Sequence, residues 1–146
     1  MKDMFSNVLL KRVISPGSVS DNTAQVGQII DRQGFNSLTY LIGIGSVADA
    51  DATFAVLLEE GDVSDLSDGA AVADADMISQ TSGTAPEAAA GFQFDDDNEV
   101  RKLGYRGNKR YTRLTITPTG NASAAALTAM ALLGDPNLSP VTQSAS

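Results

Sequence analysis

The chain has 146 residues, enough for one domain with a single core, and carries a net charge of −8. It contains no cysteine and no histidine, which excludes disulfides, thiolate metal sites, cysteine nucleophiles and a Ser-His-Asp triad. The acidic balance disfavours nucleic acid as the main partner, because phosphate contacts need Lys and Arg. With no Trp, five Phe and three Tyr, the core is expected to be built from small residues in thin layers.

The N-terminal half predicts short strands separated by turns. Residues Asn7–Ser15 are expected to form a strand or arm that ends at the turn signal Ser15-Pro16-Gly17. Residues Thr23–Asp31 fit either a helical or a strand period. Ser37–Val47 is a short apolar run with β-branched and aromatic residues, which predicts a buried strand, and Ala52–Gly61 predicts another.

The middle of the chain is rich in Asp, Ser, Gly, Ala and Thr. Residues Gly61–Gly91 therefore predict loops, with one short strand at Ala75–Ser79. The segment Ala89–Asp95 predicts a further strand. No apolar run reaches the roughly 18 residues of a membrane-spanning helix, and the N-terminus lacks the apolar core of a secretory signal, so a cytosol-like compartment is expected.

Charge is sorted along the chain. No Lys or Arg occurs between Gln33 and Val100, where 14 of the 18 acidic residues lie. The stretch Arg101–Arg113 then holds six of the ten basic residues and no acidic one. Complementary charged faces let proteins bind in fixed register, so this pattern favours a protein-docking surface. A nucleic-acid patch with tyrosine stacking platforms and an ordinary solvated hairpin are the alternatives.

The basic stretch predicts a β-hairpin. Residues Glu99–Gly107 lead in, Gly107-Asn108 tolerates positive φ, and Lys109–Thr117 leads out. On the second strand the alternation is clean. Tyr111, Arg113, Thr115 and Thr117 share one face, and Thr112, Leu114 and Ile116 share the other.

The segment Ala124–Gly134 fits two structures. Ala, Leu and Met favour a helix ending at Gly134, whereas the short Gly-Asn turn before it suits an antiparallel hairpin. We predict a strand, in part from the resemblance given below. The Pro-punctuated residues 135–146 predict an extended tail.

These elements predict an all-β fold. We expect a jelly roll or β-sandwich of about seven or eight antiparallel strands with extended termini. Residues 1–146 would form one domain, with an N-terminal arm or strand at 1–15 and a C-terminal tail at 135–146.

The acidic residues do not predict a catalytic or metal site. Asp95–Glu99 lacks the spacing of an EF-hand loop, so a solvated acidic turn is favoured over a calcium site. Glu59 and Glu60 are neighbours on a strand and would point to opposite faces, which disfavours a glycosidase pair. We therefore expect no enzyme activity, no metal and no cofactor.

Three motifs resemble a known family. The first is "GYxGxKRYxRL" at residues 104–114, the second "LEEGDxSDLSD" at 58–68, and the third a "G-D-P…PV" tail at 134–141. Together with the paired strands upstream, the match covers about residues 34–141. The sequence resembles small virion proteins of tailed bacteriophages, the capsid cement (decoration, head-stabilisation) proteins, and is similar to the cement protein of a short-tailed Bordetella phage.

The resemblance implies a structural virion protein that binds and bridges major capsid protein subunits on the outer surface of the head. It would be made in the host bacterial cytoplasm and pair with itself, as a homodimer or else a homotrimer, with no membrane partner. A head-tail connector or tail component is the alternative. We expect the protein interface to include Arg101, Lys102, Tyr105, Arg106, Lys109, Arg110, Tyr111 and Arg113, with Tyr105 and Tyr111 as anchors.

Overall fold

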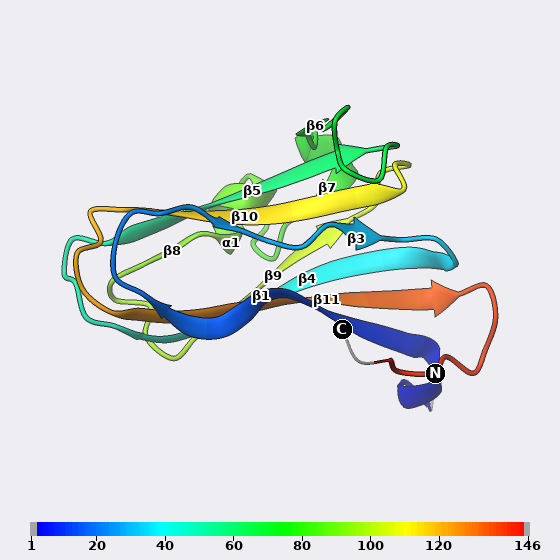
Figure 1. The fold of residues 1–146 in the computed structure, drawn as a ribbon, viewed down its shortest axis with the longest axis horizontal. Coiled ribbons are helices and arrows are strands. Elements are labelled where there is room, and N and C mark those ends of the chain that lie inside the picture. Colours follow the sequence, from blue (N-terminus) through cyan, green and yellow to red (C-terminus); the bar gives the residue numbers. More distant parts are fainter. Residues whose placement is uncertain (1–2, 145–146) are drawn as a thin grey trace.

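Two antiparallel sheets pack face to face over residues 3–144, the part of the chain that the computed structural model describes (Figure 1). The five-stranded sheet has the order β1 (Val8–Val19), β11 (Ala125–Pro136), β4 (Phe35–Val47), β9 (Val100–Tyr105), β7 (Met77–Ile78). The six-stranded sheet has the order β2 (Gln25–Val26), β10 (Tyr111–Thr119), β5 (Thr53–Gly61), β6 (Ala70–Ala71), with β3 (Ile30–Asp31) on β10 and β8 (Phe92–Gln93) on β5.

The predicted all-β sandwich is confirmed, with more strands than expected. Residues 3–144 contain eleven strands, of which five are only two residues long. Three short helical segments complete the structure: the 3₁₀ turns η1 (Phe5–Asn7) and η2 (Asp74–Asp76), and the helix α1 (Pro86–Ala90). The predicted strand at Ala89–Asp95 is reduced to β8, because α1 takes up its first two residues.

In the long strands β4, β5 and β11, buried side chains alternate with more exposed ones. The strands predicted at Ser37–Val47 and Ala52–Gly61 are β4 and β5. The strand preferred at Ala124–Gly134 is β11, whose buried alanines lie beside larger residues of β4. Ala131 pairs across the ladder with Tyr40, the largest fully buried side chain, so a small residue fits there despite its helical propensity.

The prediction that the first strand ends at Ser15-Pro16-Gly17 is wrong. β1 continues to Val19, and two register shifts against β11, one on each side of Ile14, absorb the irregular residues. Proline is tolerated here because β1 is an edge strand, where a missing N–H breaks no ladder hydrogen bond on the free side.

The predicted hairpin at residues 99–117 is also wrong. β9 pairs with β4 and β7, whereas β10 pairs with β5, β2 and β3, so the two strands belong to different sheets. We call residues 106–110, which cross between the sheets, the crossover segment. β10 and β11 likewise lie in different sheets and form no hairpin. The alternation predicted for β10 is confirmed, since Thr112, Leu114 and Ile116 are buried.

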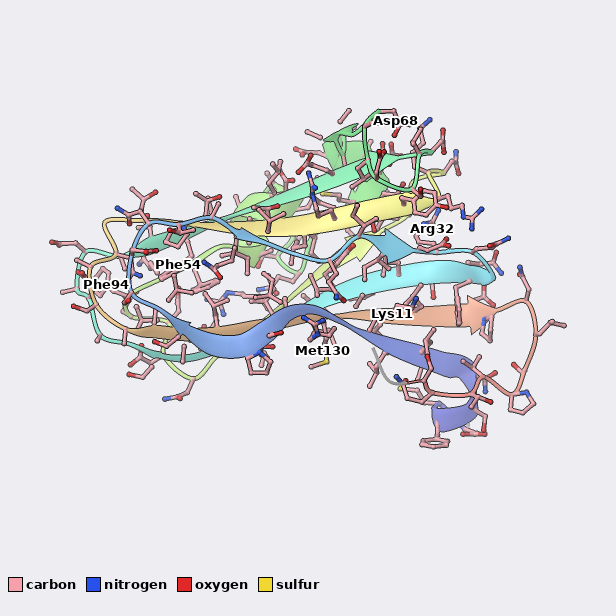
Figure 2. All side chains as sticks on the ribbon, viewed as in Figure 1. Lys11, Arg32, Phe54, Asp68, Phe94 and Met130 are labelled. Carbon is pink, nitrogen blue, oxygen red and sulfur yellow. The ribbon has the colours of Figure 1, made fainter. Side chains whose placement is uncertain are left out.

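The core between the sheets is apolar, with one polar contact at its centre. The Tyr40 hydroxyl of β4 lies 2.6 Å from the Thr112 hydroxyl of β10, and both side chains are fully buried. Burial raises the pKa of Tyr40 above its ordinary value. Nearer one end, the rings of Phe54 and Phe92 stack with centroids 4.6 Å apart, and Figure 2 shows Phe54 between the two layers. The hydroxyl pair therefore joins the two sheets directly.

One side of the sandwich is closed by the segment between β2 and β3. Gly27 donates its N–H to the Leu114 carbonyl of β10 (2.8 Å), and Gln28 donates to the Val13 carbonyl of β1 (3.0 Å). A Cβ on Gly27 would lie 2.5 Å from that same Leu114 oxygen and 2.6 Å from Val13 Cγ1. Only glycine fits between the two sheets at this point.

The C-terminal tail lies along the free edge of β1. Val141 donates its N–H to the Ser6 carbonyl (2.8 Å). The Gln143 side chain accepts from the Leu10 N–H (3.0 Å) and donates to the Leu10 carbonyl (2.8 Å). The Gln143 amide therefore hydrogen-bonds the Leu10 N–H and carbonyl, the two backbone groups that a neighbouring strand would otherwise bind. Residues 1–2 and 145–146 of the predicted arms lie outside the described residues.

Candidate interaction surface

The predicted interface residues do not line a hairpin and are spread over both sheets. They lie on three successive elements: Arg101, Lys102 and Tyr105 on β9, Arg106, Lys109 and Arg110 in the crossover segment, and Tyr111 and Arg113 on β10. Since β9 and β10 lie in different sheets, these side chains do not share one face.

Carboxylates of the preceding acidic stretch pair with two of the cations. Arg113 lies opposite Glu59 in the β5–β10 ladder, and its Nη2 is 3.2 Å from Glu59 Oε1. Lys109 Nζ is 2.6 Å from Asp62 Oδ2, which raises the pKa of Lys109. The sorted charges thus meet within the chain, because the β5–β10 ladder brings the two stretches side by side.

Two further arginines are paired in the same way. Arg110 binds Asp31 of β3 through two parallel hydrogen bonds of 2.9 Å, and this lowers the pKa of the Asp31 carboxyl. Arg101 lies 3.0 Å from Asp96 and also pairs with Glu99. Both arginines therefore form ion pairs with carboxylates of the same chain.

Tyr105 is part of the core and is not a surface anchor. Its side chain is 3% exposed, and its hydroxyl donates to Glu60 and accepts the Lys109 N–H (3.1 Å). The Arg32 guanidinium stacks 4.7 Å from its ring centroid. Burial, together with the Glu60 contact, raises the pKa of Tyr105. A Cβ on Gly107 would lie 2.5 Å from this hydroxyl, which explains the glycine in the crossover segment.

The two charged motifs are therefore structural partners. Residues 58–68 supply Glu59, Glu60 and Asp62, and residues 104–114 supply the groups that they bind. The sequence contained the signal for this contact, since complementary charges were sorted into two stretches. Sequence reasoning assigned the basic stretch to an outside partner and missed the internal one.

Two of the predicted cations keep no ion pair within residues 3–144. Arg106 donates from Nε to the Ala75 carbonyl (2.9 Å). Lys102 is exposed, and its ammonium makes no hydrogen bond or ion pair to the described residues; only its backbone N–H binds Gln80 (2.8 Å). Lys102 points outward from β9, because Leu103 beside it is fully buried.

The outward surface of the five-stranded sheet is apolar, a feature that sequence reasoning missed. We call it the outer apolar face. Its apolar side chains come from β1, β4, β9 and β11: Leu10, Leu41, Val100, Met130 and Leu132. Thr128, Arg12 and Lys102 lie among them, with Arg12 opposite Met130 in the β1–β11 ladder. Figure 2 shows Met130 on the side of β11 that faces away from the six-stranded sheet. The outward surface of that other sheet carries the Arg113–Glu59 pair instead.

Shallow hollows mark this face. One of about 570 Å³ lies over β4, β9 and β11 and is lined by Leu41, Val100 and Met130, with Lys102 at its border. A second, of about 470 Å³, lies between Met130 and Leu10 and reaches the tail. The five-stranded sheet thus offers an indented apolar surface across several strands.

The acidic turn before β9 is held by backbone contacts. Asp96 accepts the Gln93 N–H (2.8 Å), and Asp97 accepts the Val47 N–H (2.9 Å). Within the described residues no cluster of three or more acidic side chains is arranged to hold a metal ion. Glu59 pairs with Arg113, whereas Glu60 accepts a hydrogen bond from the Tyr105 hydroxyl. None of the helical segments in residues 3–144 has the length and hydropathy to cross a membrane.

The fold and this surface define an all-β sandwich with one apolar sheet face. No protein-family model and no curated protein sequence matches the chain. Among solved structures it is similar to the PBSX exported protein XepA, with a TM-score of 0.54 and 12% identity. The similarity covers 94% of this chain but only 40% of XepA, so the chain spans less than half of that protein.

Two other solved structures show weaker likeness. The SPBc2 prophage-derived protein YomS gives a TM-score of 0.47 at 10% identity, covering 86% of this chain and 93% of YomS. The CBM22-1 and GH10 modules of a Clostridium thermocellum xylanase give 0.42 at 9%, covering 97% of this chain and 28% of that one. At 12% identity the similarity to XepA shows a shared fold alone, and the two weaker matches carry no further argument.

Proposed function

We propose that the chain is a capsid cement protein of a tailed bacteriophage, a structural protein without enzyme activity. It would bind the outside of the head and bridge subunits of the major capsid protein. The observation that carries this proposal is the outer apolar face, because monomeric proteins rarely leave a broad apolar surface uncovered unless it binds something. Its side chains at Val100 (77% exposed) and Met130 (37%) are open to solvent in the single chain.

Two further observations support a structural role. Many polar side chains of the basic and acidic motifs are paired within the chain: Tyr105 with Glu60 joins the two sheets, whereas Arg113 with Glu59 and Arg110 with Asp31 brace the six-stranded sheet. The sequence motifs resemble those of phage cement proteins, and the fold is shared with XepA, which is described as an exported protein of PBSX. A protein that coats a shell needs a scaffold and a contact surface, and the sandwich with its outer apolar face suits these two needs.

Quantitative mass spectrometry of purified particles tests the proposal. Cement protein is expected in numbers comparable to the major capsid protein, and heads assembled without it should open at lower temperature and regain stability when it is added back. A connector or tail component would instead be found in a few copies per particle. Absence of the protein from purified heads would refute the proposal.

A further inference from the structure

The outer apolar face requires a cover that the described chain does not supply. The tail segment 137–144 follows the edge of β1 and reaches only the border of the face, through Gln143 and Ser144. Met130, Leu41 and Val100 lie further in, on β11, β4 and β9, and line the hollow of about 570 Å³. Their apolar surface would be removed from water only by another molecule.

Charge distinguishes the classes of molecule that could bind there. Lys102 lies directly opposite Leu41 in the β4–β9 ladder, in the same row as Met130, and its ammonium has no partner in residues 3–144. The carboxylates nearest the face lie at strand ends: Glu99 pairs with Arg101, and Asp135 lies at the end of β11. A molecule that packs over Met130, Leu41 and Lys102 and encloses the ammonium must therefore supply an acceptor for it, since a buried unpaired ammonium is costly.

A second copy of this chain does not meet that requirement. Packing two identical faces together would bring no carboxylate to Lys102, because none stands at an outward position of β4, β9 or the central part of β11. Every copy also carries a net charge of −8, which opposes self-association at low salt. The contact favoured by the residues is with a different protein.

We infer that the outer apolar face docks a protein surface that presents an apolar patch with a carboxylate beside it, and that Lys102 binds this carboxylate. Met130 and Leu41 are the central apolar contacts. The location of this partner, on the phage head, rests on the proposed function. The face and the chemistry of its partner follow from the residues.

Co-sedimentation with phage particles tests the inference. Heads and tails that lack the protein are purified separately and mixed with wild type, Met130→Glu, Lys102→Glu or Leu57→Glu. Leu57 is the matched control, because it lies on β5 in the other sheet and is 39% exposed, close to the 37% of Met130. Circular dichroism and thermal melting verify that each variant is folded. Light scattering of each free protein gives its oligomeric state.

The inference predicts that Met130→Glu and Lys102→Glu bind at least about tenfold more weakly while Leu57→Glu binds like wild type. Loss of head binding in both variants supports the docking face and the cement function together. If wild type binds tails but not heads, and both variants lose the binding to tails, the docking face is supported and the cement function is refuted.

The opposite outcomes overturn the inference. Head binding that neither substitution changes would refute the docking face while leaving the cement function standing. Binding to neither particle would refute both. A wild-type dimer that Met130→Glu converts to a monomer would show that a second copy covers the face. If Met130→Glu does not fold, Lys102→Glu decides the result, because that side chain is exposed and outside the core.

Discussion

The buried hydroxyl pair between the sheets gives a prediction with a definite magnitude. Tyr40→Phe removes the hydroxyl that lies 2.6 Å from Thr112 and leaves a buried polar group without a partner. Such an orphaned group costs about 1–3 kcal/mol. For a chain of this size we expect the melting temperature to fall by roughly 2–10 °C. Thr112→Val should cost a similar amount, because it orphans the tyrosine hydroxyl instead.

The double variant separates this explanation from simple loss of packing. With both hydroxyls replaced by apolar groups of the same shape no orphan remains, so the double variant should lose less than the sum of the two single losses. Urea unfolding followed by circular dichroism gives the free energies, with Tyr111→Phe as a control expected within about 0.5 kcal/mol of wild type. Additive losses in the double variant, or a neutral Tyr40→Phe, would refute the reasoning.

Three further outcomes are expected. Gly27→Ala should lower the free energy of unfolding by about 2 kcal/mol or more, since its Cβ would overlap a backbone oxygen. Gly17→Ala should be close to neutral in the same urea assay, because its Cβ would make only an ordinary contact, 3.8 Å from the Ser15 carbonyl oxygen. Burial raises the pKa of Tyr40 and Tyr105 in the fold above the unfolded value of 10.0, so their contribution is complete below pH 10 and is lost as the pH rises beyond it. The melting temperature should then drop above pH 10. Ionisation of Tyr40 and Tyr105 in the folded protein below pH 10, detected as tyrosinate absorbance, would contradict this. Gln143→Ala should leave the fold intact but increase self-association measured by light scattering, because it uncovers the edge of β1; an unchanged scattering profile would show that the edge needs no such cover.

The local sequence pattern was sufficient to predict where the strands lie, but not which strands pair with each other. The apolar, β-branched run at Ser37–Val47 correctly indicates a strand, and the alternation in β10 correctly separates Thr112, Leu114 and Ile116 from the opposite face. Gly107-Asn108 correctly signals a reversal of the chain, yet a reversal within one sheet and a crossing between two use the same turn residues. The deciding contacts are long-range ladders, such as Arg113 opposite Glu59, and no short segment of sequence contains them.

The candidate site was predictable only in part, for a related reason. The basic residues were identified as a cluster, but their carboxylate partners lie on other strands, and Tyr105 is enclosed by Arg32 and Glu60 from elsewhere in the chain. Met130 and Leu41 read as core residues in sequence, because an apolar side chain on a strand gives no indication of which sheet surface will be covered. Only the order of the strands shows that they point outward.

The pairing of β1 with β11 determines when this protein can fold. The first of the described strands pairs with the last of them, with Val8 opposite Gly134 and Val19 opposite Ala125. At translation rates of 5–20 residues per second, β1 waits roughly 6–25 s for its partner strand to be made. The five-stranded sheet is therefore completed only after β11 has been made. Such non-local topologies fold slowly, and β1 remains exposed to intermolecular pairing during that wait.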